Sequence, residues 1–145
     1  MQKFRRKSDS YSTAHPFRIT CAIMREEAAS MNLETQKILA KRTIRTWADE
    51  RLEKGKSAFT GEVRFSSYLI YEPIKGNGQK AMYEHAVVFE GDVSPYVNTG
   101  GVSSEEKALD ELAFLLMTTF KQSRVKVALL GEHWILESNP EYVHE

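Results

Sequence analysis

The sequence contains one cysteine, Cys21, in 145 residues, and it has no long apolar run. A single cysteine cannot form an internal disulfide, so a reducing, cytosolic-type compartment is the expected setting. No stretch approaches the roughly 20 apolar residues that a membrane-spanning helix needs. The basic stretch at residues 1–10 has no apolar region behind it, unlike a secretory signal. These absences predict a cytoplasmic protein.

The sequence also lacks the spacings that are typical of metal, phosphate and nucleophile sites. The histidines are scattered, without metal-ligand spacing, at His15, His85, His133 and His144. Residues 98–101 resemble an anion-binding loop only superficially, because no Gly-Lys-Ser/Thr follows and two glutamates do. Cys21 lies between isoleucines, without the features that stabilise a thiolate. We therefore expect no catalytic centre, no metal ion and no cofactor.

The sequence does show a succession of strand and helix patterns. Residues 16–24 alternate apolar and mixed positions, as a half-buried strand does. Residues 25–54 are rich in helix formers and carry an apolar stripe, although β-branched residues leave a strand over residues 38–47 as an alternative. Residues 62–72 and 82–90 predict two strands of a hairpin, joined by a turn rich in glycine.

A second helix is predicted after residue 101. Ser103 and Glu106 fit a capping box at its start. Apolar residues then follow helical spacing and predict a buried stripe: Leu109, Leu112, Ala113, Leu116 and Phe120. Phe114 and Leu115 lie beside this stripe, so the helix is apolar over more than half its circumference. Residues 125–130 and 134–137 predict a final strand or hairpin.

This order of elements predicts a ferredoxin-like α+β sandwich, βαββαβ, with an antiparallel sheet and two helices on one face. The terminal hairpin would add a fifth strand. We expect a basic N-terminal arm over residues 1–15, a single domain over 16–138 and a C-terminal tail over 139–145.

The charge is unevenly distributed along the chain. Residues 1–60 carry 13 Lys and Arg against 7 Asp and Glu, and residues 61–145 carry the reverse, 7 against 13. This asymmetry favours a non-catalytic module that docks on another protein or on copies of itself, with no small-molecule substrate. The expected partner-binding residues are basic side chains and exposed aromatics: Lys3, Arg5, Arg6, Lys7, Lys41, Arg42, Arg45, Phe114 and Trp134.

Two other functions stay open. The basic half could bind nucleic acid without sequence preference, through salt-sensitive phosphate contacts. Alternatively, the chain could be a hydrolase or transferase that uses His85 or His133 as a base. For His85, which shares a strand side with Val87 and Phe89, a core position is the favoured interpretation.

Overall fold

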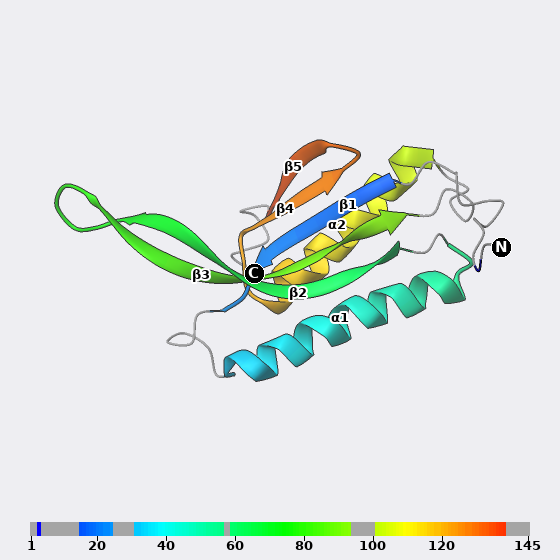
Figure 1. Ribbon diagram of the computed structural model, residues 1–145, viewed down its shortest axis with the longest axis horizontal. Coiled ribbons are helices and arrows are strands. Elements are labelled where there is room, and N and C mark those ends of the chain that lie inside the picture. Colours follow the sequence, from blue (N-terminus) through cyan, green and yellow to red (C-terminus); the bar gives the residue numbers. More distant parts are fainter. Residues whose placement is uncertain (1–2, 4–14, 25–30, 57–58, 94–100, 139–145) are drawn as a thin grey trace.

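Five strands of the described residues form one antiparallel sheet, in the order β2-β3-β1-β4-β5 (Figure 1). The computed structural model describes residues 3, 15–24, 31–56, 59–93 and 101–138. The strands are β1 (His15–Ala22), β2 (Phe59–Pro73), β3 (Gln79–Val93), β4 (Arg124–Leu129) and β5 (Glu132–Glu137). The helices are α1 (Leu33–Glu53) and α2 (Gly101–Thr119). The prediction of a small α+β protein with a fifth strand is confirmed.

Both helices contribute to one core. Alternate residues of β1, namely Phe17, Ile19 and Cys21, are buried in a cluster with side chains of α1 and α2. Phe17, Val87 and Leu109 belong to this cluster, as the sequence predicts for strand and helix faces that share an interior.

The start of α1 is fixed by Asn32, whose side-chain oxygen accepts a hydrogen bond from the Thr35 amide at 2.9 Å. The helix that follows runs through residues 38–47, so the alternative strand there is wrong. In α2 the predicted stripe is buried in full. The predicted capping box is wrong, because α2 already begins at Gly101 and Ser103 lies inside the helix.

The β2–β3 hairpin is longer than the sequence pattern predicts. Each strand has 15 residues, and Gly76 and Gly78 in the connecting turn have φ of 100° and 127°. β1 pairs with β3 as far as Ala22 and Ala86, and one further backbone hydrogen bond joins the Ile23 amide to the His85 carbonyl. Beyond His85, β2 and β3 pair only with each other among the described residues. This part of the hairpin projects away from the rest of the structure (Figure 1).

The predicted arm and tail fall largely outside the described residues, so the division into arm, domain and tail stays a prediction. In the part of the chain that the structure describes, neither helix is long and apolar enough to cross a membrane.

Candidate binding site on the open face of the sheet

The face of the sheet that points away from the core carries most of the polar strand residues. Because strand residues alternate between faces, Arg18, Thr20 and Ala22 lie opposite to the buried residues of β1. We call this side the open face.

The strand register places residues of neighbouring strands in rows across the open face. Arg18 of β1 pairs with Ala128 of β4, which pairs with His133 of β5. In the next row Thr20 pairs with Lys126. Lys126 in turn pairs with Ile135 of β5, so residues that are far apart in the sequence become neighbours.

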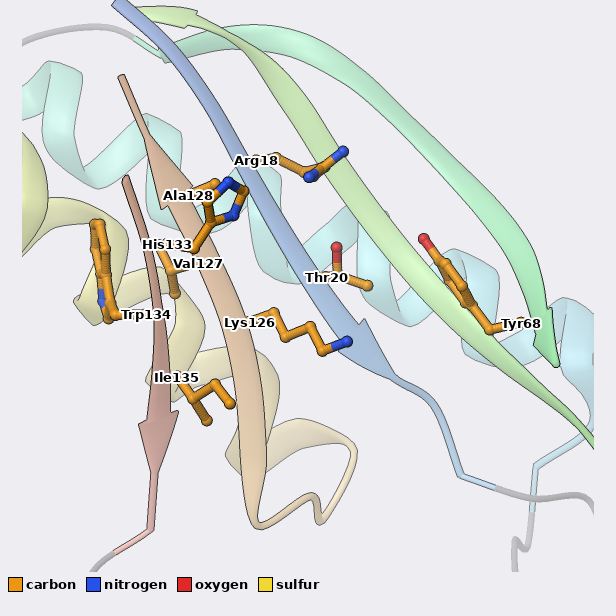
Figure 2. A pocket seen from close by; sticks show the side chains of 9 residues that line it. All are labelled: Arg18, Thr20, Tyr68, Lys126, Val127, Ala128, His133, Trp134 and Ile135. Carbon is orange, nitrogen blue, oxygen red and sulfur yellow. The ribbon is translucent and has the colours of Figure 1, made fainter. Parts of the chain in front are cut away.

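These rows enclose a cavity of about 470 Å³ (Figure 2). It is lined by Arg18, Thr20, Tyr68, Lys126, Val127, Ala128, His133, Trp134 and Ile135. A second hollow of about 380 Å³ shares Thr20, Tyr68, Lys126 and Ile135 with the first, and it adds Glu84 toward the hairpin. Both volumes fall within the range of small-molecule sites, which is roughly 300–1,000 Å³.

The hollow has a simple steric cause. Thr20 and Ala128 have short side chains, and longer side chains surround them. Figure 2 shows Arg18 and Lys126 on either side of Thr20, with Tyr68 across from them. Tyr68 is 39% exposed, so part of its ring is free to contact a bound molecule.

The cavity lining carries two basic side chains, Arg18 and Lys126, and no acidic one. Among the described residues, neither Arg18 nor Lys126 forms an ion pair or a side-chain hydrogen bond. Other cations on the same sheet are paired: Arg64 with Glu90, and Arg124 with Glu137 at 2.9 Å. Arg18 and Lys126 therefore retain their capacity to bind an anionic group.

The structure does not gather the predicted partner-binding residues into one site. Lys41, Arg42 and Arg45 lie on α1, and Arg45 lies 3.6 Å from Asp49. Phe114 is 59% exposed on α2.

Of the other predicted partner-binding residues, only Trp134 lines the cavity. Its ring lies apart from the other lining side chains (Figure 2) and packs against the core. Lys3 is exposed, whereas Arg5, Arg6 and Lys7 lie outside the described residues. The role of the whole set in partner binding stays a prediction.

The residues weighed as catalytic groups have different positions. His133 lines the cavity. His85 is exposed, and its Nδ1 lies 3.0 Å from Ser67 Oγ, so its interpretation as a core histidine is wrong. Cys21 is fully buried, and desolvation, assisted by the charge of Glu84, raises its pKa to about 12. Its thiol is therefore poorly suited to nucleophilic attack.

The sequence interpretation missed Arg18, Thr20, Tyr68 and Lys126. A signal was present, because Arg18 and Thr20 alternate with buried residues in β1 and Lys126 does so in β4. That pattern alone, however, is also typical of an ordinary solvated sheet face. Among the described residues, no three His, Cys, Asp or Glu side chains gather as metal ligands.

No family model and no curated protein matches this sequence. The fold, however, is similar to that of a phage SAM lyase. In complex with S-methyl-5'-thioadenosine that structure has 17% sequence identity and a TM-score of 0.54, over 86% of this chain and 90% of the other. Its apo state has 12% identity and a TM-score of 0.50 over the same shares. At these identities the likeness is one of fold.

This likeness overturns three predictions. The chain was expected to be a non-catalytic interaction module or a nucleic-acid binder, not to be an enzyme, and to have no small-molecule substrate. The protein that shares its fold nearly from end to end is an enzyme, and one of its structures contains a small molecule. The sequence led to the wrong expectation because a site assembled across several strands leaves no contiguous motif in it.

Proposed function

We propose that this protein is a lyase that cleaves S-adenosylmethionine (SAM) and that its substrate binds in the open-face cavity. The observation that carries the proposal is the similarity of this fold to that of a phage SAM lyase. The similarity covers 86% of this chain, and the matched structure is a complex with S-methyl-5'-thioadenosine. The size of the cavity, about 470 Å³, supports it.

We also propose that the fold is a ferredoxin-like sandwich extended by one strand. The antiparallel order β2-β3-β1-β4 and the shared core of the two helices support this assignment. On this assignment β5 is the addition, and it supplies the cavity wall that contains His133 and Ile135.

The chemistry of the lining suits the parts of SAM. The exposed part of the Tyr68 ring offers a surface on which adenine can stack or a sulfonium cation can lie. Glu84, in the adjoining hollow, offers a negative charge to the sulfonium or the ammonium group. Arg18 and Lys126 offer positive charge to the carboxylate of SAM.

A lyase must release the thioether without using water as the nucleophile. In SAM the bond between sulfur and Cγ breaks and its electron pair stays on sulfur, which becomes the neutral thioether of S-methyl-5'-thioadenosine. A carboxylate oxygen of the same molecule bonds to Cγ and closes a lactone ring. No base is needed, because the attacking carboxylate carries no proton. The protein then contributes by holding the substrate in a folded, reactive conformation.

The test is product analysis by mass spectrometry after incubation of the purified protein with SAM in isotopically labelled water. We expect S-methyl-5'-thioadenosine and the unlabelled lactone at early times. Homoserine labelled in its hydroxyl group would instead indicate attack of water on Cγ, the reaction expected of a hydrolase with His133 as base. Homoserine labelled in its hydroxyl group, or no cleavage of SAM, would overturn the proposal, whereas homoserine labelled in its carboxyl group is the expected product of later hydrolysis of the lactone.

Substitution of two alanines by phenylalanine tests whether the substrate binds in the cavity. Ala128 lines the cavity, so Ala128→Phe should fill the hollow and abolish product formation. Ala81 is exposed on the projecting hairpin and lines neither hollow, so Ala81→Phe should leave the rate unchanged. Equal rates in the two variants would place the substrate elsewhere.

A further inference from the structure

The two unpaired cations of the cavity lie close together. Thr20 pairs with Lys126 and Arg18 pairs with Ala128, so Lys126 is the diagonal neighbour of Arg18 on the open face. Such diagonal positions in an antiparallel pair are separated by roughly 7–8 Å. Two long side chains at that separation can both reach one small anion.

The side chains that line the cavity are basic or uncharged. An acidic side chain next to Arg18, Glu90 on β3, lies outside this lining and pairs with Arg64. The nine residues that line the cavity include Arg18, Lys126 and His133, but neither aspartate nor glutamate. The nearest acidic lining residue, Glu84, belongs to the second hollow, beyond Thr20 and Tyr68. The second hollow also contains Arg124, which pairs with Glu137, and it shares Lys126 with the first. Glu84 is therefore a single carboxylate beside these cations.

We infer that Arg18 and Lys126 jointly bind the substrate's carboxylate, so that the site selects adenosyl sulfur compounds that carry an amino-acid moiety. This inference rests on the proposed function. A guanidinium group binds a carboxylate through two parallel hydrogen bonds, and an ammonium group adds a second point charge. In the part of the chain that the structure describes, neither cation has an ion-pair partner to leave, so no broken ion pair there offsets the gain from binding the anion.

The alternative anion is a phosphate group, which arginine and lysine also bind. We favour the carboxylate because SAM, the substrate of the proposed function, carries a carboxylate and no phosphate. Glu84 in the adjoining hollow can attract the cationic centre that accompanies the carboxylate of an amino acid.

The test uses two ligands that differ in the carboxylate alone: S-adenosylhomocysteine and its decarboxylated form, S-adenosyl-3-thiopropylamine. Titration calorimetry measures their Kd values for the wild-type protein and for Arg18→Met and Lys126→Met. We expect the wild type to prefer S-adenosylhomocysteine by at least about tenfold, which is what one charge-assisted contact provides. Each substitution should remove most of this preference and leave the Kd of the decarboxylated ligand unchanged.

Lys41→Met and Arg42→Met are the matched controls, because both residues are exposed cations of α1 that line neither hollow. They should not change either Kd. The inference fails if Arg18→Met and Lys126→Met weaken the binding of both ligands equally, or of neither ligand. It also fails if adenosine monophosphate binds more tightly than S-adenosylhomocysteine. If the wild type cleaves SAM but shows no preference for the carboxylate, the inference alone is wrong. If it neither cleaves SAM nor binds either ligand, the proposed function is wrong as well.

Discussion

Trp134 Nε1 donates a hydrogen bond to Asp110 Oδ1 at 2.7 Å, and this contact ties the edge strand β5 to α2. β5 is an edge strand that pairs only with β4 among the described residues. Trp134 therefore holds in place the strand from which His133 and Ile135 reach the cavity. This is a positioning role, different from the predicted docking of Trp134 on a partner.

Trp134→Phe removes the indole donor and keeps an aromatic ring. We expect the free energy of unfolding to fall by about 1.5–3 kcal/mol, because a hydrogen bond to a charged acceptor is lost. Urea denaturation, monitored by circular dichroism, measures this free energy of unfolding. Asp110→Asn keeps an oxygen acceptor and should cost less. A Trp134→Phe variant as stable as the wild type would show that the hydrogen bond is not important.

A second prediction concerns the buried pair of His15 and Glu105. The Glu105 side chain is 0% exposed, and His15 Nδ1 lies 2.8 Å and 2.9 Å from its two carboxylate oxygens. Removal of one partner from a buried pair costs about 3–5 kcal/mol, because the other charge is left without compensation. His15→Ala should destabilise the protein by about this amount in chemical denaturation.

The matched control for this pair is the double variant His15→Leu with Glu105→Leu. It removes both polar groups, so it should be less destabilised than His15→Ala alone. If the double variant is the less stable of the two, the pair does not behave as a buried charge pair.

Cys21 predicts how stability depends on alkaline pH. Its pKa is raised from 9.0 to about 12 in the folded protein, mainly by desolvation and further by Glu84. Above pH 9 the unfolded chain loses the thiol proton and the folded chain keeps it, so the free energy of unfolding falls as the pH rises toward 12. The slope is at most about 1.4 kcal/mol per pH unit.

Cys21→Val removes this thiol and keeps an apolar side chain of similar size. The wild type should therefore lose stability relative to Cys21→Val between about pH 9 and the folded pKa of about 12 in urea titrations. Parallel curves for the two proteins would contradict the prediction. A thiol reagent near neutral pH should modify the wild type only in denaturant.

The pairing of β2 with β3 depends on a close backbone approach at Gly91. A Cβ atom there would lie 1.9 Å from the carbonyl oxygen of Thr60, so the two strands would have to move apart. Gly91→Ala should therefore destabilise the protein by more than Gly55→Ala. Gly55 has φ of 69°, but a Cβ atom at that position would meet nothing within 4 Å. Alanine at Gly55 therefore meets only backbone strain, about 1–2 kcal/mol. Thermal denaturation of the two variants measures the difference. An equal loss of stability in Gly91→Ala and Gly55→Ala would contradict the prediction.

The secondary structure was largely predictable because it depends on local patterns. The alternation in β1 and the helical spacing from Leu109 to Phe120 both reflect which residues are buried, and both are confirmed. The hairpin length was not predictable, because its outer residues pair only with each other and are not sorted into a buried and an exposed side.

The candidate site was not predictable from the sequence, although it contains two residues that the sequence singled out for other roles, His133 and Trp134. His133 was weighed as a base, yet nothing local connects it with Arg18. Most of the expected partner-binding residues came from runs of charge or from exposed aromatics, which are visible in sequence but do not line the cavity. Arg18 and Lys126 each lie between two apolar neighbours on an alternating strand. Isolated polar residues of this kind give no distinctive signal in the sequence.

The order of strands and helices, and the buried sides of β1 and α2, followed from the sequence alone, because apolar and polar residues recur there with the period of the local backbone. The meeting of Arg18, Lys126, His133 and Tyr68 around one hollow was decided only by the tertiary structure. Pairing of β1 with β4, and of β4 with β5, sets which distant residues become neighbours. That register arises when the strands assemble over a common core, and no segment of the chain encodes it by itself.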